Sequence, residues 1–174
     1  MGRFNRLLGG FGHGDWQTHC YHLAGVFPAE RFVLFAVQEL VFHEWDIRSR
    51  IEQGAAVSSA MLPTLMERIP GRFGTAPGYD DFLLDSGGVT SVRYRFQVTG
   101  AGPGQWDILV EEQKARMEAA VAGPAEVTFQ CDTNTFVVLM YKRLILDPLL
   151  TDGSLTGEGD RDLVSVFNHW LKGE

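Results

Sequence analysis

The feature that most constrains the fold is a change of hydrophobic period about halfway along the chain. In the first half, apolar residues recur at helical spacing, and within residues 32–42 only Gln38 and Glu39 are polar. After Gly88 the period becomes two, so that every second residue of the stretch VRYRFQV is apolar. Helical segments followed by alternating strands are typical of the α+β class, which we therefore expect here.

The N-terminal unit is predicted to contain an arm, a long helix and a shorter helix. Residues 1–27 are rich in glycine, histidine and aromatic residues and show no clean period, so we expect an irregular segment or a short arm. Pro28 suits the first turn of a helix that runs to about Gln53, where Gly54 supplies a stop. A second helix is expected over residues 58–68, before the Gly/Pro-rich stretch GRFGTAPGYDD that separates the two units.

The second unit is predicted to be a sheet with helices. Strands are expected at VTSVRYRFQV, QWDILVEE, AEVTFQC and SLTGE, and also at KARMEAAVAG, which lies between strands although its composition would suit a helix. Helices are expected at TNTFVVLMYKRL, at DPLL and near the C-terminus, with Asp132 and Asp160 as caps. The pattern predicts an antiparallel or mixed sheet of about five strands with two to three helices. The predicted domains are residues 1–72 and residues 88–174.

Composition excludes several classes of partner. The net charge is −7 and no basic run exists to neutralise phosphates, so we expect neither nucleic acid nor an anionic membrane as a partner. The longest apolar runs, residues 32–37 and 136–141, are too short to span a bilayer. The two cysteines, Cys20 and Cys131, lie far apart and form no CxxC motif, which favours a reduced, cytoplasmic protein.

The long helix carries a polar stripe in the stretch ELVFHEWDIRSRI. Glu39, His43, Asp46 and Arg50 are spaced by 4, 3 and 4 residues, so they share one side of a helix. A glutamate and a histidine one turn apart can share a divalent metal ion such as zinc. They can equally form a buried hydrogen-bonded ladder with the acid and the arginine, and residue types alone favour the ladder.

Two further groups are weaker candidates. The HCYH segment at residues 19–22, with His13 upstream, offers imidazoles that could complete a metal site, but its spacing matches no standard zinc motif. Lys142 and Arg143 follow an apolar helix, where a cation is favoured by the helix dipole or can bind an anion.

Several of these stretches together resemble a known family. PAERFVLFAVQELVFHEWDI is similar to the last bundle helix of the mycothiol-dependent maleylpyruvate isomerase family, a branch of the DinB/YfiT-like metal-binding bundles, in which a proline-containing entry precedes an E-x-x-x-H-x-x-D-I/L helix. The WDI strand, the unit AEVTFQCDTNTFVVLMYKRL and the terminal DGSLTGEGDRDLVSVFNHWL resemble the companion domain of that family, which has a sterol-carrier-protein-like fold. The resemblance begins near residue 25.

The resemblance implies a metal centre. The metal, usually zinc, would be held by Glu39, by His43 and by a third histidine, for which His22 is the candidate, with His13, His19 or a partner chain as alternatives. Asp46 would stand behind the ligands, and Arg143 would face the active site. A low-molecular-weight thiol such as mycothiol would add to a small-molecule substrate. The family's first three bundle helices have no counterpart here, so the resemblance is to an N-terminally truncated member, with only the remnant of a bundle.

Two functions follow as expectations. The first is a metal- and thiol-dependent isomerase or transferase-like protein, either a shortened or inactive member or a fragment of a longer enzyme. The second is a non-catalytic sterol-carrier-like module that binds a small apolar ligand. We also expect a homodimer, because the largely apolar helix at 32–42 needs cover that the short arm cannot fully give.

Overall fold

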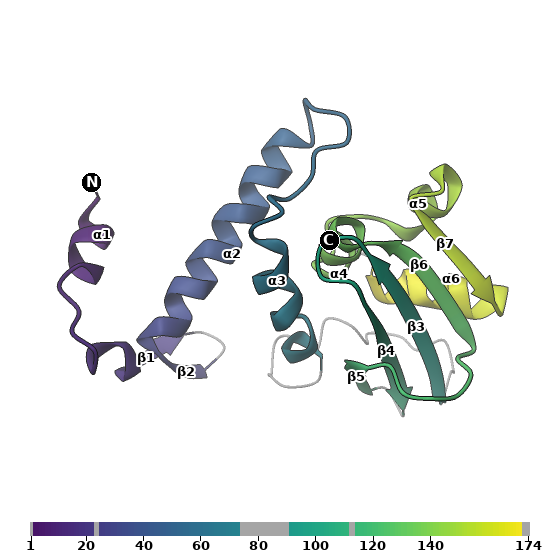
Figure 1. Ribbon diagram of the computed structural model, residues 1–174, viewed down its shortest axis with the longest axis horizontal. Helices are drawn as coiled ribbons and strands as arrows, with labels where there is room; N and C mark the ends of the chain where they lie inside the picture. Colours follow the sequence, from purple (N-terminus) through teal and green to yellow (C-terminus); the bar gives the residue numbers. More distant parts are fainter. Residues whose placement is uncertain (1, 23–24, 74–90, 112–113, 172–174) are drawn as a thin grey trace.

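The computed structural model describes residues 2–22, 25–73, 91–111 and 114–171. Figure 1 shows an N-terminal helical region beside a sheet that is covered by helices, which confirms the predicted α+β class. The predicted boundary at residues 73–87 lies almost wholly outside the described residues. Among the residues that are described, no helix combines the length and the apolar character needed to cross a bilayer.

The arm is more regular than its sequence indicates. It holds the short helix α1 (Arg3–Leu8), the 3₁₀ turn η1 (Asp15–Gln17) and an antiparallel hairpin of β1 (His19–His22) and β2 (Gly25–Pro28). The prediction of an irregular arm was therefore wrong for this hairpin. Its strands have four residues each, which is too short for an alternating pattern to stand out.

Helix α2 (Ala29–Arg48) follows directly and is the longest element. It begins where predicted, but it ends five residues before the predicted Gln53. The reversal is fixed by side chains, because the indole N–H of Trp45 donates to the Ala55 carbonyl (2.9 Å). Gly54 then takes a positive φ of 76°, which a glycine adopts without strain.

The chain next forms α3 (Leu62–Arg68) and the 3₁₀ turn η2 (Pro70–Arg72). Helix α3 starts later than the predicted serine cap, because residues 58–61 form a turn in which Met61 N–H donates to the Ser58 carbonyl. Pro63 then lies in the first helical turn, where its missing N–H costs no hydrogen bond.

The second unit contains a five-stranded mixed sheet in the order β5-β4-β3-β6-β7. Only β3 and β6 run parallel, and the other neighbours are antiparallel. All five strands were predicted, including the ambiguous segment that forms β5. Their bounds are β3 (Ser91–Thr99), β4 (Gly104–Glu111), β5 (Lys114–Ala119), β6 (Val127–Asp132) and β7 (Leu155–Gly159).

Three helices pack on one face of the sheet: α4 (Thr133–Met140), α5 (Leu146–Asp152) and α6 (Arg161–Leu171). The predicted caps are confirmed, because the carboxylate of Asp132 accepts the Thr135 N–H (2.7 Å) and that of Asp160 accepts the Asp162 N–H (2.8 Å). Helix α4 ends at Met140, earlier than expected, since Lys142 takes a left-handed φ of 59° that reverses the chain.

Helix α4 joins the two units into one core. Its residues 136–140 are fully buried, because the sheet covers one side and the N-terminal helices cover the other. The rings of Phe42 on α2 and Tyr141 lie 4.2 Å apart, and the Asn134 side chain accepts the Val57 N–H (2.8 Å). The N-terminal half of α2, the hairpin and α1 instead project away from the sheet (Figure 1).

Candidate functional site

The two predicted metal ligands lie side by side on the surface of α2. His43 Nε2 is 3.3 Å from Glu39 Oε2, and its Nδ1 is 3.4 Å from Asp46 Oδ2. Two ligand atoms of a tetrahedral zinc ion, each about 2.0–2.1 Å from the metal, lie roughly 3.3 Å apart, so the Glu39–His43 spacing suits a shared ion. Both side chains are 64% exposed, however, so the expectation of a buried ladder is corrected to a solvent-exposed one.

The candidate third ligand, His22, is held elsewhere. Its ring stacks on Phe35 with centroids 4.8 Å apart and contacts Phe27 and Phe32 edge-on. Phe35 lies eight residues before His43, which is about 12 Å along a helix. His22 thus packs within an aromatic cluster rather than beside Glu39 and His43.

No group of three or more His, Cys, Asp or Glu side chains within the described ranges is placed to hold a metal ion. Glu39 and His43 therefore supply two donors, and the described residues alone do not fit a complete zinc centre. The third donor that the family resemblance calls for stays a prediction.

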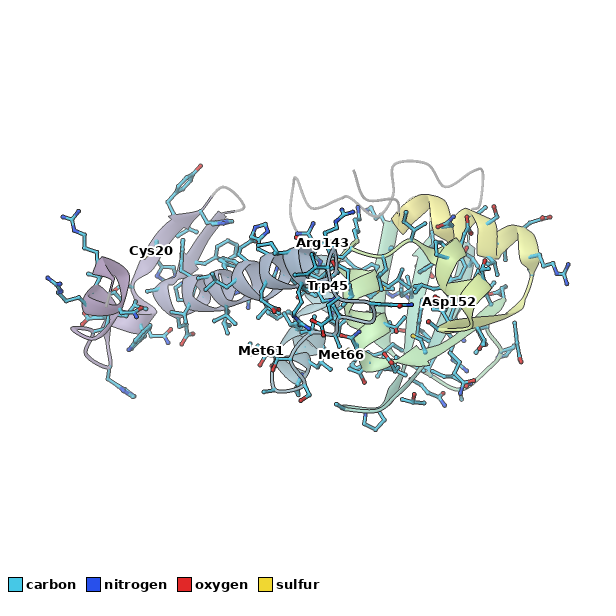
Figure 2. All side chains as sticks on the ribbon, turned by 90° about the horizontal axis from the view of Figure 1, so that it is seen from above. Cys20, Trp45, Met61, Met66, Arg143 and Asp152 are labelled. Carbon is cyan, nitrogen blue, oxygen red and sulfur yellow. The ribbon has the colours of Figure 1, made fainter. Side chains whose placement is uncertain are left out.

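Asp46 and Arg143, the predicted acid and arginine, lie close together. Arg143 Nε lies 3.4 Å from Asp46 Oδ1, so the polar stripe continues from α2 onto the turn that follows α4. Figure 2 places Arg143 close to Trp45 where the two units meet. The left-handed residue Lys142 directs the chain back toward α2, which accounts for this contact. Arg50, by contrast, lies beyond the end of α2 and is exposed.

Sequence reasoning missed a buried ion pair on the outer face of the sheet. Asp107 is fully buried and accepts two hydrogen bonds from Arg95, at 2.8 and 2.9 Å. Arg95 also donates to the carbonyls of Val121 and Gly123, in the connection from β5 to β6. The Arg95 guanidinium beside Asp107 lowers the pKa of that carboxyl.

This ion pair has a structural role. The β5–β6 connection crosses the outer face of β4 and β3, and it has no helix to satisfy its backbone groups. Asp107 and Arg95 face each other across β3 and β4 and supply those hydrogen bonds. The alternation of VRYRFQV places Arg95 on the outer face, but only the strand register shows that Asp107 is its neighbour.

The inner face of the sheet forms an aromatic interior between the strands and the helices. Tyr94, Phe96 and Phe129 project from β3 and β6, and Phe136 and Phe167 meet them from α4 and α6. Four of these ring pairs have centroids within 5.2 Å. The rings fill this interior, which is desolvated and nearly free of polar groups and so is not suited to acid–base chemistry.

Few polar groups reach this interior. The Tyr94 hydroxyl donates to the Leu163 carbonyl on α6 (3.0 Å), and burial raises the pKa of Tyr94. Burial likewise raises the pKa of the Cys131 thiol to about 12, so Cys131 is a core residue and not a nucleophile. The buried indole N–H of Trp106, which projects from β4 on the same face, has no acceptor among the described residues.

Several solved structures are similar to this chain over part of its length. Similar solved structures include the palmitated SCP2L2 of Aedes aegypti (21% identity, 69% of this chain and 97% of that chain, TM-score 0.46). A UbiJ-SCP2 ubiquinone synthesis protein is similar over 64% of this chain and 93% of that chain (15% identity, TM-score 0.44). The apo sterol carrier protein 2 of Yarrowia lipolytica is similar over 66% of this chain and 92% of that chain (10% identity, TM-score 0.44).

No curated protein matches the chain significantly in sequence. The family match is confined to the second unit, and the expected relation of the first unit to the DinB-like bundles stays a prediction. Residues 88–172 match the SCP-2 sterol transfer family, so the second half of the chain is a domain of the SCP-2 type.

Proposed function

We propose that the second unit binds a small apolar ligand, such as a sterol or an acyl chain, as a lipid-binding module. The observation that carries the proposal is the match of residues 88–172 to the SCP-2 sterol transfer family. The aromatic interior between β3, β6, α4 and α6 supports it, because the binding of an apolar ligand draws its free energy from surface removed from water.

The ligand would enter by separating α6 from the sheet. The rings of Tyr94, Phe129 and Phe167 are in mutual contact, so a ligand must displace one of them. Phe167 is carried by helix α6, and a hydrogen bond from Tyr94 to Leu163 ties that helix to the strand beneath it. The buried N–H of Trp106 offers a donor to the one polar group of such a ligand.

Energy transfer from tryptophan tests both binding and place. A fluorescent sterol or polyene fatty acid should bind saturably, with one molecule per chain. Because Trp45 and Trp170 remain as donors, Trp106→Phe should lower the transfer only in part, but it should lower it more than Trp16→Phe on the distant arm, the matched control. Absence of saturable binding of either probe refutes the function, and loss of transfer only in Trp16→Phe refutes the site.

A second candidate rests on one observation, the 3.3 Å spacing of Glu39 and His43. A thiol-dependent isomerase or transferase-like activity would need a metal there, with a third donor from another part of the chain or from a partner. Metal analysis of tag-free protein tests it. Stoichiometric zinc that is lost in both Glu39→Ala and His43→Ala supports the metal site. A parent protein without metal refutes it.

A further inference from the structure

The indole N–H of Trp106 marks a place for the polar group of a ligand in the aromatic interior. The strand register sets Trp106 between Phe96 on β3 and Ala119 on β5, so its side chain lies on the inner face. The N–H is buried and has no acceptor among the described residues. A buried donor without an acceptor costs free energy, and an oxygen atom of a bound ligand would remove that cost.

A glycine lies next to this N–H. Gly104 precedes Trp106 by two residues on the same side of β4, and a Cβ built on it would lie 3.2 Å from Trp106 Nε1. A side chain at position 104 would crowd the indole N–H, whereas glycine leaves room beside it. Because an indole N–H donates and never accepts, the ligand atom that binds it must be an acceptor.

The strands supply no charge to match an ionised ligand. Every described strand residue that the register sets on the side of Phe96 and Trp106 is uncharged. Arg93 and Arg95 point to the opposite face of the sheet, where their Nε atoms lie 3.8 and 2.8 Å from the Asp107 carboxylate. The sheet itself therefore separates these cations from the interior.

Two arginines of the first unit are also partly buried, but they are engaged elsewhere. The guanidinium of Arg68 lies 4.9 Å from the centre of the Phe35 ring, and that of Arg72 lies 4.3 Å from the centre of the Tyr141 ring. Both contacts lie where α2 and α3 meet the end of α4.

Two ionisable groups on the inner face are held neutral. Burial raises the pKa of Cys131 to about 12 and also raises the pKa of Tyr94. The charged neighbours that add to these shifts are carboxylates: Asp132 for Cys131, and Asp160 with Glu126 for Tyr94. An ionised carboxylate brought into the same space would lose its hydration and meet the same negative neighbours.

We propose that the SCP-2-type domain selects lipids whose polar end is an uncharged hydrogen-bond acceptor, such as the carbonyl of an ester or a ketone, over ionised fatty acids, and that Trp106 binds this group. This selectivity rests on the proposed lipid binding and narrows its class of ligand. An ester carbonyl accepts the Trp106 N–H and leaves no charge unpaired, whereas a carboxylate in the same place is buried without a cation.

Three probes with one conjugated polyene chain test the selectivity: the methyl ester, the free acid and the hydrocarbon. Direct excitation of the polyene reports binding without a tryptophan donor, at pH ~7.5, where a carboxyl group of pKa about 4.3 is ionised. The ester should bind the parent protein at least about tenfold more tightly than the acid. Trp106→Phe should weaken the ester about 3- to 10-fold, which corresponds to one neutral hydrogen bond, and leave the hydrocarbon unchanged.

Ala119→Lys adds the missing charge. Ala119 is exposed and lies opposite Trp106 in the β4–β5 register, so a lysine there places an ammonium group near the indole without filling the core. The acid should then bind at least about threefold more tightly, while the ester stays unchanged. Ala119→Gln, which adds length without charge, is the matched control and should change neither affinity.

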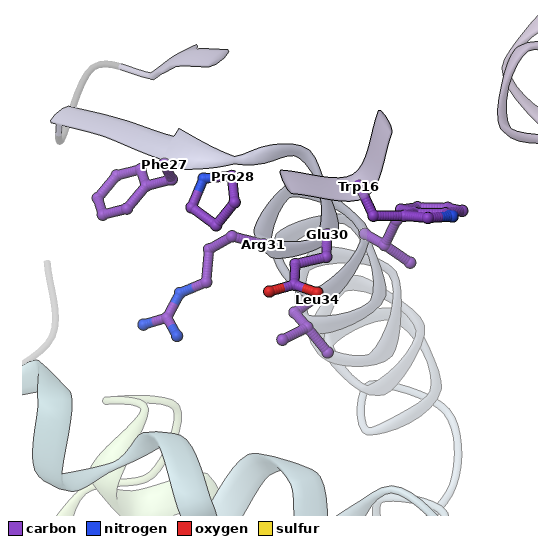
Figure 3. Close-up of a pocket in the computed structure, with 7 residues that line it drawn as sticks. Trp16, Phe27, Pro28, Glu30, Arg31 and Leu34 are labelled. Atoms are coloured by element: carbon purple, nitrogen blue, oxygen red, sulfur yellow. The ribbon is translucent and has the colours of Figure 1, made fainter. Parts of the chain in front are cut away.

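A groove at the N-terminal end of α2 is a second place for an apolar probe to bind. It has a volume of about 470 Å³, and its walls include Trp16, Phe27 and Leu34 (Figure 3). Trp16→Phe should leave all three affinities unchanged if the probes bind in the aromatic interior. Weaker binding of the ester in Trp16→Phe but not in Trp106→Phe overturns the proposal.

The remaining outcomes separate the selectivity from lipid binding itself. An acid that binds as tightly as the ester, or an ester affinity that Trp106→Phe leaves unchanged, overturns the selectivity but not the lipid-binding function. If circular dichroism shows that Trp106→Phe is unfolded, Ala119→Lys decides, and an unchanged ratio of acid to ester affinity overturns the selectivity. If no probe binds the parent saturably, lipid binding is refuted and the selectivity with it.

Discussion

Replacing Asp107 with asparagine should destabilise the SCP-2-type domain strongly. The carboxylate is fully buried and receives hydrogen bonds from Arg95 Nε (2.8 Å), from Arg95 Nη2 (2.9 Å) and from the Val121 N–H (3.3 Å). Asparagine keeps the shape and one acceptor oxygen but leaves the Arg95 charge without its counter-ion. Breaking a buried ion pair costs about 3–5 kcal/mol. Since Arg95 keeps its bonds to two loop carbonyls, we expect the lower end, about 3 kcal/mol.

Urea unfolding followed by circular dichroism measures this loss, with Glu111→Gln as the control. Glu111 also binds an arginine, Arg116 at 2.7 Å, but both side chains are more than half exposed, so its loss should cost less than about 1 kcal/mol. An Asp107→Asn effect no larger than that of Glu111→Gln would refute the reasoning that burial makes the pair matter.

The pH dependence gives the same prediction an independent check. The folded state lowers the pKa of Asp107, so its stabilisation is present above the unfolded pKa of about 3.9 and is lost as the pH falls through the folded value. The gap in unfolding free energy between parent and Asp107→Asn should therefore be full at pH 7 and shrink below pH ~4. A gap that stays constant to pH ~2 would contradict the assignment.

Three further predictions follow from single contacts. A thiol reagent at pH ~8 should label Cys20 in the native protein but reach Cys131 only after unfolding, because burial raises the pKa of Cys131 to about 12; a second thiol that reacts natively contradicts this. Asp132→Ala should lower the unfolding free energy by about 1 kcal/mol in urea titrations, since it removes the cap of α4. Asp46→Asn should cost less than about 1 kcal/mol and less still in 1 M salt, because its pair with Arg143 is part-exposed.

The strands of the sheet could be predicted because the alternation of apolar and polar residues lies within each strand. Alternation alone places Tyr94 and Phe96 inward and Arg95 outward, and burial in the structure follows that pattern. The Glu39–His43 contact was equally predictable, since residues four apart on a helix are always neighbours. Its exposure was not predictable, because periodicity shows which residues share a face but not whether that face is covered.

The parts that could not be predicted depend on chain reversals. The Arg143–Asp46 pair forms because Lys142 takes a left-handed conformation. That conformation favours glycine, so a lysine at this position gives no sequence signal for it. His22 was the candidate third ligand, yet a short hairpin turns it onto Phe35. The β5–β6 connection likewise depends on the β3–β4 register, which sets Arg95 beside Asp107. The register of β7 beside β6 is equally strict, because a Cβ on Gly159 would overlap the carbonyl oxygen of Glu126.

Two faces of helix α2 contact the rest of the described chain in different ways. Phe42 and Trp45 close the core over α4, whose apolar residues would otherwise be in water. The row from Glu39 to Asp46 meets Arg143, so any ligand of that row is held where the two units join.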